Sequence, residues 1–423
     1  MNTALLILLL TAVAYGFIIF GKKNTPVVVF GIGAIMFALK LVEGMNVENL
    51  SHVVDFNTLG ILFGMMIIVG FLKRTGFFQY AALQVMKISR GRFWLMLTLL
   101  MSLTAIMSAF LDNLITIILL APIVFLISDT LNLDPTPLLL LTVFADNIGG
   151  SSTLIGSPLN IVLGSASGLS FNEFLVNLGP MAILAFVMTM FIYKKRIGDV
   201  GNVKSKLIEL AKVDPSKSIT DKKLLTRTLY VFLIVIAGLA LHDLIDVELA
   251  LVTVLGAVAL LLITGHTFEE TAEDVDWNIL FLFAGLYAIS YALEGIGVTE
   301  KLAALFMPLQ SKQWLVLLIM VWTGALITPF LSAVPAVLLF APVIRFLVGH
   351  GFTPDLWWAY AIGANLGSNL TSLGAVQNIV GIRLLEKSTG RSLSFGEFMR
   401  RAFGVVFPTL LVGSAYVLLL LGR

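Results

Sequence analysis

The residues best suited to bind an ion lie in the middle of a strongly apolar stretch. Residues 145–160 read ADNIGGSSTLIGSPLN, between PLLLLTVF and IVLGSASG. Gly149–Gly150 and Pro158 are expected to break a membrane helix here, which frees backbone amides and carbonyls. Free amides at a helix N-terminus suit an anion, whereas free carbonyls suit a cation. The segment therefore predicts an ion site built largely from backbone.

A second segment repeats this device. Residues 365–378 read NLGSNLTSLGAVQN and align with NIGGSSTLIGSPLN at 147–160. One glycine pair alone is as well explained by a kink or by close helix packing as by a site. Two polar breaks at matched positions favour the functional interpretation.

Two short polar segments precede the breaks, SAFLDN at 108–113 and LSAVPA at 331–336. Each interrupts an apolar stretch, 93–128 or 313–348, that is longer than the ~20 residues one span requires. These stretches predict re-entrant hairpins, each entering and leaving the membrane on one side. The hairpin tips are expected to meet the two breaks.

Asp112 and Asp146 are the carboxylates in these segments. Intramembrane carboxylates usually mark ion or proton paths, although an aspartate can also cap a helix or lie at the interface. Protonation and cation binding compete at a buried carboxylate, so Asp112 is the expected coupling group. The matching positions of the second repeat, Ser332 and Ala364, carry no charge.

The elements that must position these residues are membrane helices. The chain has 423 residues, of which 58% are hydrophobic and only 12% charged, against about 25% charged in a soluble domain. It has no cysteine, which excludes disulfides and thiolate chemistry within this chain. It also lacks a Walker motif, a Gly-x-Ser-x-Gly motif, a His/Cys cluster and a basic–aromatic surface. We therefore expect no ATPase, no enzyme, no cofactor and no nucleic-acid partner.

The apolar stretches predict an all-α polytopic membrane protein with about ten transmembrane helices. The expected helices are 3–20, 25–42, 56–73, 137–166, 172–193, 224–242, 248–265, 277–294, 357–386 and 401–421. The first lacks a basic n-region and a clear cleavage site, so we interpret it as a retained helix rather than a signal peptide.

The two halves of the chain resemble each other. Four blocks recur at nearly constant spacing, for example LSFNEF at 169–174 and LSFGEF at 393–398. The pattern predicts a first repeat over 1–193, a basic connector over 194–223 and a second repeat over 224–423. An odd number of crossings per repeat inverts the second relative to the first, as in secondary transporters.

Basic residues orient the chain. Ten lysines and arginines lie between residues 194 and 227, so the positive-inside rule places the connector in the cytoplasm. Both termini are then expected outside a multi-pass protein of the inner (plasma) membrane.

LDNLITIILLAPI at 111–123 and DNIGGSSTLIGSPLNIVLG at 146–164 resemble the ion transporter superfamily. The resemblance is to its branch of arsenite permeases, NhaD-type sodium/proton antiporters and P-protein relatives, and it covers roughly residues 25–420. It implies a homodimer with alternating access by a sliding, elevator-type transport domain. It also implies that the tips and broken helices form the transport site.

The positions that match the family's site are Asp112, Asn113, Asn147, Gly149, Gly150, Thr153, Gly156, Pro158, Asn160, Ser332, Pro335, Asn365, Gly367, Thr371, Gly374 and Asn378. Asp146 joins this set as a carboxylate beside the break. A coupling Na+ is expected near Asp112, Asn147 and Asn365.

Together these features predict a secondary active ion permease, coupled to H+ or Na+, that moves an inorganic ion or oxyanion such as arsenite. Two alternatives are a Na+/H+ antiporter and a Na+- or H+-coupled dicarboxylate or citrate transporter. An ion channel is the alternative of another class. Paired hairpins in inverted repeats favour a transporter over a channel.

Overall fold

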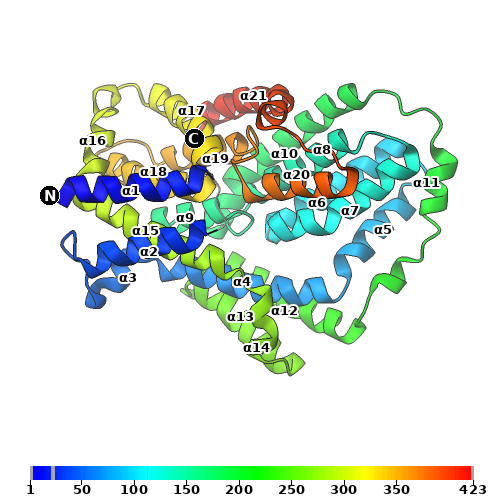
Figure 1. Ribbon diagram of the computed structural model, residues 1–423, viewed down its shortest axis with the longest axis horizontal. Helices are drawn as coiled ribbons and strands as arrows, with labels where there is room; N and C mark the ends of the chain where they lie inside the picture. The colour runs from blue at the N-terminus through cyan, green and yellow to red at the C-terminus, as the bar shows by residue number, and fades with distance from the viewer. Residues whose placement is uncertain (1–2, 21–23, 112, 421–423) are drawn as a thin grey trace.

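A computed structural model of the protein describes residues 3–20, 24–111 and 113–420 (Figure 1). Every regular element in these residues is a helix, which confirms the all-α prediction. The helices of the first half are α1 (Thr3–Ile19), α2 (Thr25–Ala38), α3 (Leu50–Val53), α4 (Phe56–Arg74), α5 (Phe77–Ile88), α6 (Phe93–Phe110), α7 (Asn113–Leu131), α8 (Pro135–Gly150), α9 (Pro158–Ser167) and α10 (Phe171–Ile197).

The connector contains one short α-helix, α11 (Lys204–Leu210), and one 3-10 turn, Pro215–Ser218. The helices of the second half are α12 (Lys222–Ile245), α13 (Leu249–Thr264), α14 (Phe268–Thr271), α15 (Trp277–Gly295), α16 (Val298–Ala304), α17 (Gln313–Leu331), α18 (Ala333–Gly349), α19 (Leu356–Gly367), α20 (Val376–Thr389) and α21 (Phe395–Leu420). The short helices α5 and α16, which precede the two hairpins, were not predicted because neither is long enough to span a membrane.

Eight of the described helices are long and apolar enough to cross a membrane, or nine if α13 and the bent segment after it form one span. The predicted count was about ten. The count of eight includes most of the hairpin arms, because these are long and apolar, and omits the short halves of the broken helices. The predicted count instead took each broken helix as one span and left out the hairpins. Both describe a multi-pass membrane protein.

The predicted hairpins and breaks are present. Helices α6 and α7 form one hairpin, while α17 and α18 form the other with only Ser332 between them. Residues 151–157 separate α8 from α9, and residues 368–375 separate α19 from α20. In Figure 1 the α6–α7 hairpin occupies the right of the molecule and the α17–α18 hairpin the left, so they enter from opposite ends. The connector with α11 lies at the right-hand end.

Equivalent helices of the two repeats make equivalent contacts. Helix α6 packs on α8 as α17 packs on α19, and α2 packs on α15 as α13 packs on α4. The repeats also interlock, because α7 contacts α20 and α18 contacts α9. Each broken helix is therefore completed by the hairpin of the other repeat, and this arrangement brings both breaks together.

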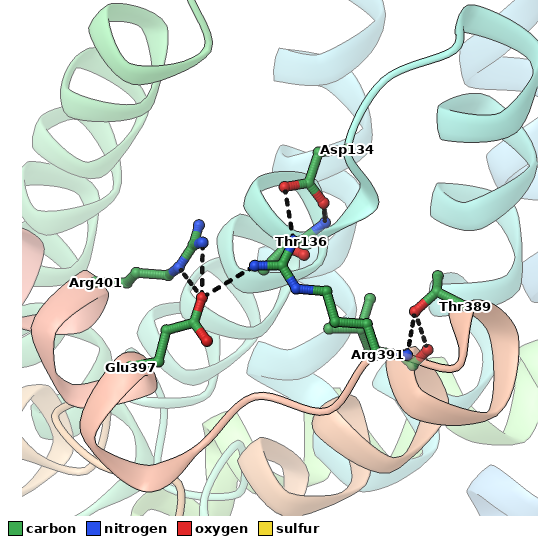
Figure 2. Close-up of polar contacts among 7 residues, drawn as sticks. Asp134, Thr136, Thr389, Arg391, Glu397 and Arg401 are labelled. Atoms are coloured by element: carbon green, nitrogen blue, oxygen red, sulfur yellow. Dashed lines mark hydrogen bonds and ion pairs between the residues drawn. The ribbon is translucent and has the colours of Figure 1, made fainter.

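A charged network ties the start of α8 and the end of α20 to the start of α21 (Figure 2). Glu397 Oε1 accepts hydrogen bonds from Arg401 Nη2 at 2.8 Å and from Arg391 Nη2 at 3.3 Å. The same Arg391 guanidinium lies 3.7 Å from Asp134 Oδ2, and Asp134 caps the N-terminus of α8. The loop between α20 and α21 is thus held against α8 by charge.

Replacing Glu397 by glutamine is expected to lower the free energy of unfolding at low salt by up to about 1 kcal/mol, because the arginines lose their carboxylate. The loss should shrink at 1 M salt, where exposed charges are screened. Melting temperatures in detergent at low and high salt would measure it. Glu173→Gln is the control, because Glu173 of α10 matches Glu397 in the repeat alignment. Glu173 accepts a hydrogen bond from Ser170 N, and no arginine is described as its partner. Equal, salt-independent losses in both variants would contradict the prediction.

Candidate functional site

The two tips and the two breaks enclose a central cavity of about 70 Å³. Four helix N-termini line it: Asn113 of α7, residues 157–159 at the start of α9, residues 332–334 at the start of α18 and residues 375–377 at the start of α20. Asn147 of α8 and Asn365 and Ser368 at the end of α19 complete the lining. None of these lining residues carries a charge.

The electrostatics of the cavity follow from this arrangement. The first amides of a helix have no carbonyl partner within the helix. Each N-terminus also carries about half a unit of positive charge from the helix dipole. Four such ends converge here, and the C-terminal ends of α8 and α19, which carry the opposite partial charge, are only two. Among the described residues the helix dipoles therefore favour a negatively charged ligand without a lysine or arginine.

Asn160 and Asn365 join the two breaks. The Asn160 amide donates to the carbonyls of Ser151 at 3.1 Å and Thr153 at 2.8 Å, both in the segment that separates α8 from α9. Its oxygen accepts a hydrogen bond from Asn365 Nδ2 at 2.8 Å. One buried side chain therefore satisfies its own break and links it to the other.

The second repeat mirrors this arrangement. The Asn378 amide donates to the carbonyls of Ser368 at 2.9 Å and Thr371 at 2.8 Å. Its oxygen accepts from Asn147 Nδ2 at 2.9 Å. The two reciprocal pairs, Asn160 with Asn365 and Asn378 with Asn147, connect residues more than 200 positions apart.

Two threonines attach the breaks to the hairpins. Thr153 donates its hydroxyl to the Ala109 carbonyl near the first tip, and Thr371 donates to the Pro329 carbonyl near the second. Thr153 Oγ1 also accepts from Gly156 N at 3.0 Å. These contacts hold each unwound segment in a fixed shape beside a hairpin tip.

The asparagine of the first break has further partners that the sequence did not suggest. Asn147 Nδ2 donates to Asn369 Oδ1 at 2.7 Å, and Asn147 Oδ1 accepts from Gln377 Nε2. Its amide oxygen is thus already hydrogen-bonded within the protein. Gln377 lies directly before Asn378, whereas the matching residue before Asn160 is Leu159. A glutamine where the other repeat has leucine was the sequence feature that could have indicated a polar role for Gln377.

The glycines of the breaks serve close packing. A Cβ on Gly149 would lie 2.6 Å from the Ala105 carbonyl carbon, and one on Gly367 would lie 2.5 Å from Ala325 Cα. Gly149 and Gly367 therefore pack against α6 and α17, respectively. Both were expected to belong to the ion site, but neither lines the cavity. Gly150, Gly156 and Gly374 allow close approach inside the breaks, since a Cβ on Gly156 would lie 2.6 Å from Gly150 O.

Two further predicted residues, Asp146 and Pro335, lie at the edge of the site. Asp146 is fully buried on α8, and its backbone carbonyl accepts from Ser108 Oγ at 2.6 Å, but it does not line the cavity. Pro335 is buried in the first turn of α18, where its carbonyl accepts from Tyr15 of α1 at 3.1 Å. Asp112 lies outside the described residues.

Ser332, which forms the second tip, has φ +68° and ψ 159°. Residues other than glycine rarely adopt this conformation, and it costs about 1–3 kcal/mol. Such strain is found where the surrounding structure imposes it, often at ligand sites. Here the single-residue joint between α17 and α18 imposes it.

A larger polar cleft of about 300 Å³ lies beside the central site, between α3, α9, α15 and α18. Arg345 in its wall donates to the Ala166 carbonyl at 3.1 Å, near the end of α9. Tyr287 donates to Asp55 Oδ2 at 3.2 Å, at the start of α4. Because α9 and α18 line both the cleft and the central cavity, the cleft flanks the site on one side.

Comparison with known proteins adds the following similarities. Residues 15–363 match a citrate transporter family, CitMHS. An uncharacterized transporter of Mycobacterium tuberculosis (strain ATCC 25618 / H37Rv) is 33% identical over 369 residues, which is 86% of each chain. A 46 kDa membrane protein of Mycobacterium leprae (strain TN) is 31% identical over 413 residues, which is 96% of each chain. The P protein of Homo sapiens is 29% identical, but the chain covers only 54% of it.

Two solved structures share the fold. The YdaH transporter of Alcanivorax borkumensis, described as having an unusual topology, aligns over 100% of this chain and 98% of its own, with a TM-score of 0.64 and 15% identity. MtrF of Neisseria gonorrhoeae, described among antimetabolite efflux pumps, aligns over 91% of this chain and 84% of its own, with a TM-score of 0.62 and 12% identity.

Proposed function

Since the chain belongs to the citrate transporter family CitMHS, we propose that it is a secondary active transporter that carries a small anion across the membrane. The proposed substrate is a small carboxylate or an inorganic oxyanion, and the proposed coupling ion is H+ or Na+. Among the functions expected from the sequence, anion transport is the one that the geometry of the cavity favours.

The observation that supports an anion is the convergence of four helix N-termini on a cavity with no charged residue among its described lining. The amide side chains of Asn113 and Gln377 add polar groups to this lining. Such a lining attracts carboxylate or oxyanion oxygens and repels a bare cation.

Charge balance gives the coupling ion a role. An anion removed from water into an apolar protein interior is costly unless its charge is compensated. We propose that H+ or Na+ provides part of this compensation. Asp112, next to Asn113 in the sequence, is the proposed coupling group.

The movement that we propose is a displacement of the hairpins and broken helices relative to the α2–α15 and α4–α13 pairs. The polar cleft between α3, α9, α15 and α18 would then give access from one side. We further propose a homodimer in the plasma membrane with both termini outside.

Counterflow in proteoliposomes tests the function. Vesicles loaded with citrate, a smaller dicarboxylate, phosphate, sulfate or arsenite are diluted into the labelled compound, with and without a Na+ or pH gradient. We expect saturable self-exchange of at least one anion. Na+-driven proton movement with no anion exchanged would overturn the proposal in favour of an antiporter. A flux that does not saturate would overturn it in favour of a channel.

Ser157 offers a sharper test of the anion site. It lines the cavity at the N-cap of α9, and its side chain makes no capping hydrogen bond. Asp and Asn are both good N-cap residues, so Ser157→Asp and Ser157→Asn should both fold. Only the aspartate places a negative charge at the helix end, so we expect it to weaken anion binding at least ten-fold.

Ser157→Asn is the matched control because it has the same shape without the charge. Binding would be measured by ligand-induced thermal shift and by the concentration dependence of counterflow. Equal affinities in the two variants would mean that the α9 N-terminus does not face the bound anion.

A further inference from the structure

The first repeat contains an apolar groove of about 330 Å³ between α6 and α10. Its floor is the first break, including Gly149 and Thr153. Ser102 and Ala105 of α6 and Gly179 of α10 contribute to the walls, together with larger apolar side chains. The groove therefore reaches from the outer surface of the helices to the unwound segment.

The second repeat carries aromatic side chains at the equivalent positions. The repeat alignment matches Ser102 to Trp322, Gly179 to Phe403 and Ile183 to Phe407. The rings of Trp322 and Phe407 lie 6.0 Å apart between centroids, and those of Phe403 and Phe407 lie 5.2 Å apart. Two small residues and one isoleucine of the first repeat thus stand where the second repeat has aromatic residues.

Helix packing differs in the same way. Helix α21 packs directly on α17 as well as on α19. In the first repeat, α10 packs on α8, and the groove occupies the space beside α6. The asymmetry involves both side-chain size and helix packing, in repeats that otherwise make matching contacts.

The surface around the groove is apolar and exposed. Ile106 of α6 is 61% exposed and Ile183 of α10 is 65% exposed. Leu175, Val176 and Val187 of α10 are also exposed. In a membrane-spanning helix such residues face lipid, so hydrocarbon is the medium from which the groove is filled.

We propose that the groove between α6 and α10 binds an acyl chain of a membrane lipid against the first break. The ligand chemistry follows from the apolar lining, from the exposed apolar surface around the groove and from the aromatic residues at the equivalent positions of the second repeat, where α21 packs directly on α17. A headgroup has no charged partner among the described residues of the lining.

The test uses purified protein in lipid nanodiscs that contain phosphatidylethanolamine with a diazirine on one acyl chain. After photolysis, mass spectrometry should find labelled peptides from α6 and α10. Gly179→Phe restores the aromatic residue of the second repeat. A Cβ at Gly179 would meet only Leu175 Cδ1 at 3.8 Å, so the substitution should be tolerated. We expect it to reduce this labelling at least five-fold.

Two further variants keep the test decisive. Ser102→Trp fills the groove from α6 and should also reduce the labelling if Gly179→Phe misfolds. The reciprocal double variant Trp322→Ser and Phe403→Gly should create new labelling on α17 and α21. Gly179→Ala is the control and should label like the wild type. Melting temperatures would establish that each variant is folded.

A second readout separates a bound chain from passing contact. Adding lipid back to delipidated protein should raise the melting temperature of the wild type by at least twice as much as that of Gly179→Phe. Labelling of α6 and α10 that is equal in wild type and filled variants would overturn the proposal. Labelling of a second copy of the chain instead of α10 would also overturn it, because a protein would then cover the groove.

Discussion

Replacing Asn160 by alanine is expected to abolish transport and to lower the free energy of unfolding by about 3–5 kcal/mol. The substitution leaves the Ser151 and Thr153 carbonyls without the Asn160 amide, while Asn365 Nδ2 loses Asn160 and keeps the Ala361 carbonyl. Each buried polar group left unsatisfied costs roughly 1–3 kcal/mol. Counterflow activity and the melting temperature of the purified protein would measure the two effects.

The second repeat supplies a matched variant. Asn378→Ala should have nearly the same effect, because Asn378 makes the equivalent bonds to Ser368 and Thr371. Asn202→Ala, at an exposed position of the connector, is the control and should change stability by less than about 1 kcal/mol. In a double-mutant cycle, Asn160→Ala and Asn365→Ala should be strongly non-additive. Additive losses would show that the two repeats are not coupled through this pair.

Replacing Gly149 by leucine is expected to abolish transport, and even Gly149→Ala should lower the free energy of unfolding by about 1–3 kcal/mol. The reason is steric, because an added Cβ would overlap the backbone of Ala105 and force α8 away from α6. Gly367→Ala should act in the same way through Ala325. Thermal unfolding and counterflow of each variant would be compared.

Gly179→Ala is the control for these glycine substitutions, since its Cβ would meet only Leu175 Cδ1 at an ordinary 3.8 Å. It tests whether any added methyl group in this region is harmful. Wild-type stability and transport in Gly149→Ala would show that the α6–α8 contact can relax, and would remove close packing as the explanation for this glycine.

The two predictions separate two roles within the breaks. The asparagines satisfy backbone groups that unwinding exposes, which is required of irregular backbone inside a membrane. The glycines allow the helix on each side to approach a hairpin arm, as small residues do in membrane interfaces. Both roles position the N-termini of α9 and α20 at the cavity, so loss of either is expected to disturb anion binding.

The sequence alone determined the elements of this protein. The apolar stretches and their polar breaks predicted the broken helices α8–α9 and α19–α20 and the hairpins α6–α7 and α17–α18, and their arrangement in two inverted repeats. These features are local, because apolar length sets a membrane helix and glycine, proline or polar residues interrupt it. The short helices α5 and α16 were not predicted, because they are neither long enough nor continuously apolar enough to be identified as membrane helices.

Only the tertiary structure decided how these elements meet. The pairs Asn160–Asn365 and Asn147–Asn378 join different repeats, and Gln377 reaches Asn147 from the other half of the chain. The cavity exists because four N-termini converge, the role of Gly149 depends on the nearness of Ala105, and the groove depends on how far α10 lies from α6. Such contacts depend on long-range packing of side chains, which a pattern of hydrophobicity along one chain does not encode.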